Sequence, residues 1–191
     1  MLILGSRLIG TPIMSLQTGA QLASIKAPVI DTSNLKIVGY EVEGPLLDIR
    51  PALLRIDDVR ELSNVGMIID SSDEFVGVDD VIDMGKMYKL NFKLIGLQVI
   101  SESKQKLGRV SDYSLDTSSF VIQQLNVRHG IIKSFTDTEL LIHRSQIVEI
   151  NDSAIVVRST AQNIKPVASP ASNSAYLNPF RSSVPSSENR K

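Results

Sequence analysis

The sequence repeats itself over most of its length, and this repetition limits the possible fold more than any other feature. Leu8-Ile9-Gly10 recurs 86 positions later as Leu94-Ile95-Gly96, and Asp31-Thr32-Ser33 recurs as Asp116-Thr117-Ser118. Further matching pairs are Leu22 and Leu107, Ile37 and Ile122, Leu53 and Leu140, and Met67 and Ile155. The spacing changes by a residue or two only where turn residues cluster, as insertions in surface loops do. We therefore expect a duplicated small domain rather than a short-period solenoid.

Both copies consist of short apolar segments separated by turn-forming residues, which indicates β-strands. The strands expected in the first copy are 8–15, 21–30, 35–43, 53–56 and 66–70, and those read most clearly in the second copy are 111–115 and 120–127. Residues 31–34 and 116–119 are rich in Asp, Ser and Thr, whose side chains favour tight turns. Several short strands within about 70 residues are typical of a small closed or nearly closed barrel. The predicted fold class is all-β, with two tandem small β-barrels.

The order of these segments resembles the PRC-barrel family. The second copy contains KLGRVSDYSLDTSSFVIQQLNV, which has the pattern Leu107-Gly108-x-Val110-x-Asp112. The first copy has Ala23, Ile25 and Ala27 at the last three of these places, so its assignment follows from its similarity to the second copy. The resemblance covers roughly residues 6–71 and 92–159. It implies barrels similar to the C-terminal domain of the ribosome-maturation factor RimM and to the cytoplasmic domain of the photosynthetic reaction-centre H subunit.

The expected boundaries place the first barrel at 1–71, a linker at 72–91, the second barrel at 92–160 and a tail at 161–191. In the linker, Asp79 is expected to cap a short helix with Asp80 in its first turn, where carboxylates interact favourably with the helix dipole. The apolar residues of this helix, which are Val78, Val81, Ile82 and Met87, predict packing against both barrels. The alternative is a metal site at Asp79, Asp80 and Asp83, but the segment lacks the Gly and the distal Glu of a calcium loop.

The tail is rich in Pro, Ser and Asn and has little to bury, so we expect it to be disordered. Its one apolar cluster comprises Tyr176, Leu177 and Asn178-Pro179-Phe180, which is either a docking motif or an inert feature of the tail. Truncation after Thr160 is expected to leave the midpoint of thermal unfolding nearly unchanged, because the removed residues bury little apolar area. A large fall in that midpoint would show that the tail packs against the body.

Charge and composition exclude several classes of protein. The chain has a formal net charge of −1, but its last 32 residues have four basic residues against one acidic residue, which leaves residues 1–159 at −4. Such an acidic body makes bulk nucleic-acid binding unlikely. The chain has no cysteine, which fits a reducing compartment, so the expected location is cytoplasmic. Its start is a poor signal peptide, and no apolar run is long enough to span a membrane.

Candidate chemical groups are few and show no known site spacing. His129 and His143 would bind a metal only if a third ligand such as Asp137 or Glu139 came close, and ordinary surface histidines are the favoured interpretation. Asp57 and Asp58 are adjacent, so on a strand they would point to opposite faces, and a charged turn is expected instead. Arginines recur every five residues at Arg50, Arg55 and Arg60, which matches no single face of a helix or strand. No catalytic, cofactor-binding or metal-binding residue is therefore predicted, and we do not expect an enzyme.

Two functions remain open from the sequence. A non-catalytic protein-binding or adaptor module is favoured, because small barrels of this size fill their interiors with side chains. The resemblance implies a ribosomal protein as a possible partner, with a link to ribosome maturation or RNA processing. The alternative is a small-molecule binding protein or an enzyme whose site lies between the barrels, where pockets often form.

Overall fold

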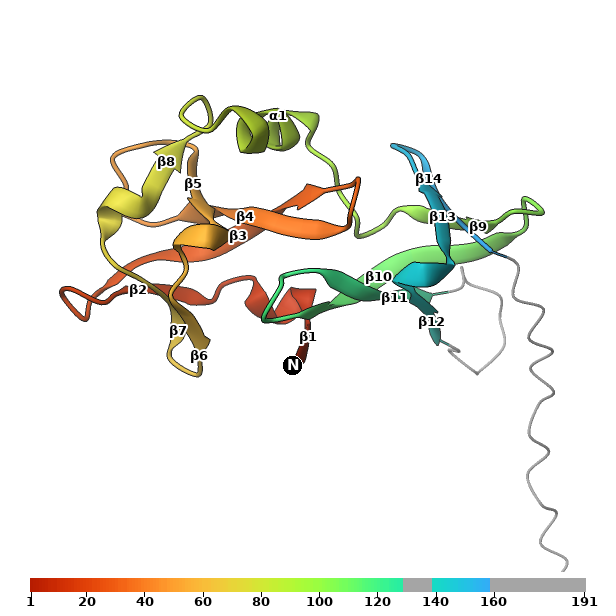
Figure 1. Ribbon diagram of the computed structural model, residues 1–191, viewed down its shortest axis with the longest axis horizontal. Coiled ribbons are helices and arrows are strands. Elements are labelled where there is room, and N and C mark those ends of the chain that lie inside the picture. Colours follow the sequence, from red (N-terminus) through yellow and green to blue (C-terminus); the bar gives the residue numbers. More distant parts are fainter. Residues whose placement is uncertain (129–138, 159–191) are drawn as a thin grey trace, which may run out of the picture. The chain divides into compact units, whose positions relative to one another are not determined.

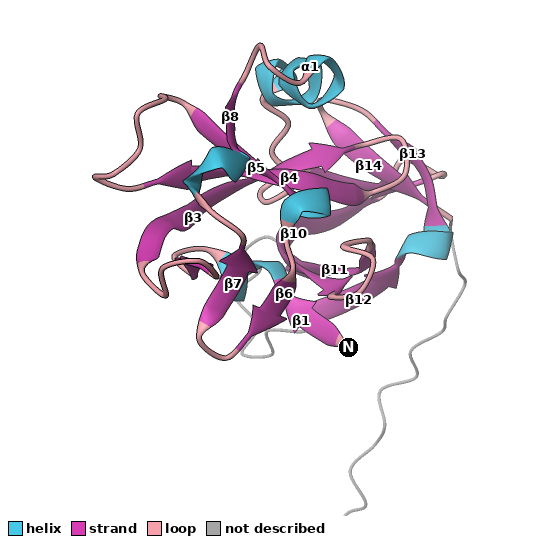
Figure 2. Cartoon of the chain, turned by 60° about the vertical axis from the view of Figure 1, so that its left-hand side comes forward, coloured by secondary structure: helices cyan, strands magenta, loops and turns pink. Residues whose placement is uncertain are grey.

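The computed structural model describes residues 1–128 and 139–158. Met1–Ser159 form one compact unit. The described residues are mostly strand, with one α-helix and several single 3-10 turns (Figure 2). The strands form two separate seven-stranded sheets, whose elements are labelled in Figure 1. The predictions of a disordered tail at 161–191 and of a docking motif at Tyr176 to Phe180 concern residues outside the described ranges.

The first sheet has the strand order β6-β7-β2-β3-β4-β5-β8. Its strands are β2 (Pro12–Ser15), β3 (Gln21–Asp31), β4 (Lys36–Glu43), β5 (Ala52–Arg55), β6 (Glu61–Ser63), β7 (Gly66–Ile69) and β8 (Phe75–Gly77). Strands β2 and β7 are parallel, and the other neighbours are antiparallel. The sheet is therefore mixed, with β3 and β4 as its long central hairpin.

The second sheet has the order β12-β11-β10-β9-β14-β13, with β1 paired to β10. Its strands are β1 (Leu2–Leu4), β9 (Gln98–Ser101), β10 (Lys106–Asp116), β11 (Ile122–Arg128), β12 (Glu139–His143), β13 (Ile147–Ile150) and β14 (Ala154–Val157). Within the described residues, the helical elements are η1 (Gly5–Leu8), η2 (Ile56–Asp58), η3 (Ser72–Glu74), α1 (Ile82–Leu90) and η4 (Arg144–Gln146). Strands β9 and β14 form the parallel pair of this sheet.

Six strands of one sheet correspond to six strands of the other in both order and register. Apart from β8 and β1, the orders β6-β7-β2-β3-β4-β5 and β13-β14-β9-β10-β11-β12 agree position by position. In the parallel pairs, Ile13 lies opposite Met67, and its sequence equivalent Val99 lies opposite Ile155. The sequence similarity between the two copies is thus accompanied by the same strand topology.

Both sheets are open, so the prediction of two closed barrels is not confirmed. In the first sheet β5, which lies next to the edge strand β8, and the opposite edge strand β6 follow one another in the chain, and the 3-10 turn η2 separates them. The chain crosses from one edge of the sheet to the other through this turn, and no ladder joins β5 to β6 in the described residues. Strand β5 pairs with β8 instead, through Leu53 opposite Val76. In the second sheet η4 separates β12 from β13 in the same way.

The first expected strand, 8–15, is only half correct. Leu8 ends the 3-10 turn η1, and the strand begins at Pro12. Between them Gly10 has a φ of +80°, and its N–H donates to Ile25 O at 2.7 Å. A residue with positive φ interrupts an extended strand, and glycine adopts this conformation at little cost. The apolar run at Leu8 and Ile9 therefore marks a turn that precedes the strand.

The expected helix in the linker exists, but its predicted cap is wrong. Helix α1 follows Val81, which makes no side-chain capping bond. Asp79 instead pairs with Lys89, with 2.7 Å between Oδ1 and Nζ, and Asp80 Oδ2 accepts a hydrogen bond of 2.6 Å from the N–H of Gly77. These carboxylates close the turn before the helix, which begins three residues after Asp79. The expected inward position of Ile82 is also wrong, since this side chain is 72% exposed.

Helix α1 packs on the first sheet. Met84 is buried against Val29 of β3 and Leu53 of β5. Partly buried apolar side chains around this cluster are Val38, Val76, Val78, Val81, Met87 and Tyr88. Phe92, beyond the helix, joins the main core instead. The linker is therefore a packed part of the body, as its apolar residues predicted. Packing of the helix against both halves was expected, and its buried residue Met84 packs against the first sheet.

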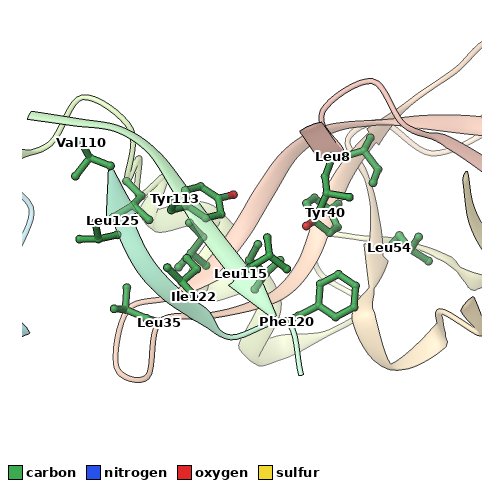
Figure 3. Packing of buried hydrophobic residues seen from close by; sticks show 14 of the residues in the cluster. Leu8, Leu35, Tyr40, Leu54, Val110, Tyr113, Leu115, Phe120, Ile122 and Leu125 are labelled. Carbon is green, nitrogen blue, oxygen red and sulfur yellow. The ribbon is translucent and has the colours of Figure 1, made fainter. Parts of the chain in front are cut away.

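One hydrophobic core runs through both halves of the body. Figure 3 shows Leu8, Tyr40 and Leu54 of the first half in the same cluster as Tyr113 and Leu115 of the second. The side chains of Ile13, Ile37, Leu54, Val99, Leu115 and Ile122 are essentially inaccessible to solvent. Burial of apolar area is the main favourable term in folding, so the two sheets stabilise each other.

A short backbone bridge joins the two sheets at their equivalent hairpin turns. Lys36 lies opposite Val121 in an antiparallel bridge. The N–H of Ile37 donates to Phe120 O at 2.9 Å, and the N–H of Ile122 donates to Leu35 O at 2.8 Å. Each of these pairs consists of one residue and the residue two positions before its own sequence equivalent. The bridge therefore has local two-fold symmetry, with Lys36 and Val121 as the related centres.

Candidate binding groove

A concave region with contributions from both halves of the body lies beside β3. It is a groove of about 550 Å³ with residues of β3 along one wall and the end of α1 and the segment after it along the other. Its lining residues are Ala27, Pro28, Val29, Ile30, Glu41, Met87, Tyr88, Lys89, Asn91, Phe92, Lys93, Leu94, Ile95 and Tyr113. Pockets of 300–1,000 Å³ hold small ligands or short peptide segments. The groove is thus large enough for such a ligand, and both halves of the body contribute to it.

Glu41 and Lys89 of the groove each form an ion pair with a residue outside its lining, Lys26 and Asp79 respectively. Glu41 Oε1 lies 2.6 Å from Lys26 Nζ, and the hydrogen bond and charge of Glu41 raise the pKa of Lys26. Burial, and then the negative charge of Glu41, raise the pKa of Tyr88. Burial also raises the pKa of Tyr113, so this phenol is neutral at physiological pH. The lining therefore offers apolar surface and neutral phenols, with charged groups at Glu41, Lys89 and Lys93.

The residues considered as metal ligands do not come together. Glu139 and His143 lie at opposite ends of β12, so their Cα atoms are roughly 13 Å apart along the strand. Glu139 Oε1 accepts a hydrogen bond of 3.1 Å from Ser111 Oγ. His143 Nδ1 accepts from the N–H of Ser145 at 3.2 Å, so His143 caps η4. His129 and Asp137 are outside the described residues, and within 1–128 and 139–158 no three His, Asp or Glu side chains form a metal site.

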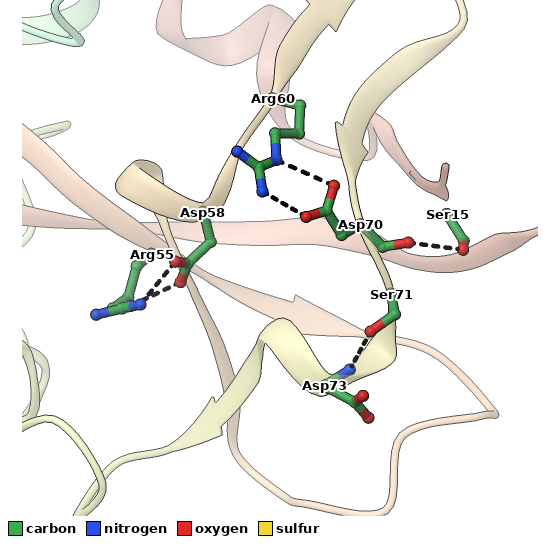
Figure 4. Close-up of polar contacts among 7 residues, drawn as sticks. All are labelled: Ser15, Arg55, Asp58, Arg60, Asp70, Ser71 and Asp73. Carbon is green, nitrogen blue, oxygen red and sulfur yellow. Dashed lines mark hydrogen bonds and ion pairs between the residues drawn. The ribbon is translucent and has the colours of Figure 1, made fainter. Parts of the chain in front are cut away.

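Two of the three arginines, Arg55 and Arg60, form ion pairs, and Asp58 of the acidic pair is the partner of Arg55. Arg55 binds Asp58 through two hydrogen bonds of 2.6 Å, and this pair fixes the turn η2 (Figure 4). Arg60 Nε lies 3.0 Å from Asp70 Oδ1, and this contact lowers the pKa of Asp70. Arg50 lines a separate shallow pocket beside Lys26 and Glu43. The expected charged turn at Asp57 and Asp58 is therefore present, and it lies away from the groove.

The sequence analysis offered a site between the two halves only as an alternative, and it named none of the residues that line the groove. Phe92 and Leu94 belong to the second copy, whereas Val29 and Ile30 belong to the first, so no local motif connects them. One signal was available, because the linker has more apolar residues than a solvated tether needs. That signal predicts packing, but packing alone does not indicate where a cavity remains.

Asp116 is the most strongly perturbed carboxylate, and it predicts a pH dependence. Hydrogen bonds from the Ser118 hydroxyl, the Met1 amino group and the Ser119 hydroxyl hold the pKa of Asp116 well below its usual range. The folded state favours the ionised form of Asp116, so its carboxylate contributes to the stability of the fold. This contribution to stability is complete above the pKa of about 3.9 in the unfolded chain, and it is lost as the pH falls toward the lowered pKa in the folded state. Asp116→Asn should therefore lower the urea midpoint at pH 7, and the difference from the unsubstituted protein should shrink below pH 4.

Asp31→Asn, at the equivalent turn, is the matched control for loss of a turn carboxylate charge without a contact to Met1. Urea midpoints measured from pH 7 to pH 2 would give the comparison. A difference for Asp116→Asn that stays constant over this range would contradict the prediction.

Comparisons with known proteins agree with the resemblance seen in the second copy. No curated protein matches the chain. Among the described helices, none is both long and apolar enough to cross a membrane. The strands from β9 to β14 all lie within one region that matches a known domain, whereas the assignment of the first copy rests on its similarity to that region. Residues 90–164 match the PRC-barrel domain.

Proposed function

We propose that this protein is a non-catalytic binding module in which two PRC-barrel units act together as an adaptor for another protein. Residues 90–164 supply one unit. Support for a second unit comes from the first sheet, in which the six strands β2 to β7 have the same order and the same parallel pair as β9 to β14. In this proposal both halves are PRC-barrel units, and each half offers its own outer surface for binding.

The single observation that carries the proposal is the shared core between the two sheets. Ile37 and Ile122 are both completely buried, and the backbone bridge between their neighbours ties the two hairpins together. Two surfaces held in a fixed orientation can engage one partner without ordering a flexible tether during binding. This arrangement therefore suits a scaffold for a macromolecule.

A second candidate function is supported by the groove. Its volume of about 550 Å³ and its apolar lining suit a small apolar molecule as well as a peptide. Glu41 is the acidic side chain in this lining, and it is already paired with Lys26. A small-molecule binding protein is thus the stronger form of this alternative, and an enzyme is the weaker form.

A ribosomal or RNA-processing partner, implied by the resemblance to RimM, has no support from the domain match, which names a general family. Such a partner enters the proposal only as one result of the experiment below.

The proposal is tested by affinity purification of the tagged chain from its native host, followed by mass spectrometry. A tagged chain that ends at Thr160 is the matched variant, because it keeps both sheets and removes the tail. We expect the same protein partner to be enriched by both chains. Enrichment that disappears with the tail would assign binding to the tail instead, and no reproducible partner would contradict an adaptor role.

A further inference from the structure

The long central strands β3 and β10 each pair along one edge with a hairpin partner, β4 and β11 respectively. They differ in what pairs with their other edge. On β10 this edge is paired first with β9 and then with β1, where Leu4 lies opposite Ser114 and Leu2 lies opposite Asp116. On β3 the corresponding edge is paired with β2 only as far as Ser24, and Ile25 bonds to the turn before β2. In the described residues no strand pairs with this edge at 27–31.

The groove lies along this unpaired edge. Val29 and Ile30 line it, although they are only 4% and 5% exposed. The side chain of Val29 packs in the cluster beneath α1, and that of Ile30 packs in the shared core. Because both side chains face packed interiors, the part of these residues that borders the groove is their main chain. Main-chain groups at a strand edge bind another extended chain through ladder hydrogen bonds.

The equivalent position in the second sheet shows what occupies such an edge. Residues 29–31 correspond to 114–116, which pair with the apolar strand β1, whose sequence is Leu-Ile-Leu. The sequence equivalents of Leu2–Leu4 are Tyr88, Lys89 and Leu90, and these form the last turn of α1 instead of a strand. Leu90 is 75% exposed there. The helical form of this segment leaves the edge of β3 without the strand that its counterpart has.

The charge at the end of the edge is also equivalent. Asp116 Oδ1 lies 3.0 Å from the Met1 amino group, so a positive charge precedes the apolar strand β1. Asp31, at the same place in the first sheet, accepts hydrogen bonds at Oδ1 from the N–H and hydroxyl of Ser33. Its other carboxylate oxygen has no partner in the described part of the chain. This oxygen is placed to receive a positive charge at the start of an incoming strand.

We propose that the groove beside β3 binds an extended apolar segment of a partner protein, preceded by a positive charge, as an additional antiparallel strand on residues 29–31. Pro28 has no N–H, which limits the new ladder to these three residues, the same length as β1. The inference rests on the proposed function, since it names the kind of segment that the adaptor would recognise.

The test uses the full chain and a fluorescent peptide with the sequence of residues 1–6, MLILGS, followed by lysines for solubility. We expect saturable binding and slower amide hydrogen exchange in β3 and in the segment 88–95. The same peptide with proline in place of its isoleucine should bind at least about tenfold more weakly, because proline removes a ladder donor and its ring disturbs the extended pairing. Equal binding of the two peptides would overturn the proposal.

A protein variant tests the charge. Asp31→Asn keeps an oxygen acceptor for Ser33 and should weaken peptide binding about two- to fivefold, as expected for an exposed ion pair. Asp152→Asn, in the turn between β13 and β14, is the matched control and should leave binding unchanged. An equal loss in both variants, or protection confined to the second sheet, would also overturn the proposal.

The same experiments separate failure of this inference from failure of the proposed function. If the host partner is captured by the chain that ends at Thr160 but the peptide does not bind, the groove proposal is wrong and the adaptor proposal stands. If the peptide binds and no partner is captured, the strand-accepting edge is supported and the adaptor role fails. Displacement of the peptide by a small apolar dye with no protection of β3 amides would identify a small-molecule pocket and overturn strand addition.

Discussion

Residues 1–72 and 92–160, produced as two separate polypeptides, should each fail to unfold cooperatively, whereas the intact chain should unfold in one transition. A domain of about 70 residues buries only about 60% of the surface that its unfolded chain exposes, so each half is marginal by itself. Separation also exposes Ile37, Leu115 and Ile122, which are completely buried in the intact body. The second half additionally loses β1, which belongs to the first copy in sequence but pairs with β10.

Circular dichroism and calorimetry of the two halves and of the intact chain would measure this dependence. Mixing the two halves at high concentration is the matched control, because contacts between them are restored without the covalent link. We expect partial recovery of a cooperative transition in the mixture. Two independent transitions in the intact chain, each unchanged from that of its isolated half, would show that the sheets do not stabilise each other.

Gly108→Ala is the single substitution for which we expect the largest loss of stability. Gly108 has a φ of +143°, and a Cβ atom added there would lie 2.2 Å from the carbonyl oxygen of Arg128. The neighbouring atom belongs to the backbone of β11, so it cannot move without disturbing the ladder between β10 and β11. We expect the free energy of unfolding to fall by about 3 kcal/mol, from backbone strain together with the steric clash.

The matched control is Ala23→Gly, at the equivalent position of the first sheet. Both residues follow the same irregularity in the ladder, where Leu22 and Leu107 are skipped in the pairing of β3 with β2 and of β10 with β9. Because Ala23 already accommodates a Cβ atom, its replacement should cost only about 1 kcal/mol, from backbone entropy and the lost methyl group. Urea unfolding of both variants would measure the two values, and similar losses would contradict a special requirement for glycine at 108.

This pair of residues also shows how far the sequence could predict the fold. Gly108 belongs to the pattern on which the family resemblance rests, and its positive φ explains why glycine stands there. Ala23 departed from the pattern, yet the bulge before it is preserved. The equivalence of strands between the two sheets followed from the aligned apolar residues, whereas the inward face of each strand, and with it the register, was not assigned from the sequence. Local pattern was therefore sufficient for β3, β4, β5 and β7 of the first sheet and for β11 of the second, but it missed β6.

The elements that differ between the copies were not predictable in the same way. Strand β1 and the last turn of α1 occupy equivalent sequence positions but have different structures; the linker helix was expected from the sequence, whereas β1 was not. Strand β8 is short and pairs with β5 through residues that were assigned to the linker. Closure of a barrel depends on whether its edge strands pair with each other. The periodic pattern of apolar residues along the sequence does not reveal this pairing. The groove arises from these differences, so it lay beyond the reach of sequence patterns.

The bridge at Lys36 and Val121 has a further consequence for the physical behaviour of the protein. A contact that relates each residue to its own counterpart is the kind of isologous contact that two identical subunits make around a two-fold axis. In a dimer of separate subunits, such a contact forms only above a certain protein concentration, and the measured stability rises with that concentration. Here both sides of the contact lie on one polypeptide, so dilution cannot separate them. The joined halves should retain the same thermal midpoint from micromolar to nanomolar protein.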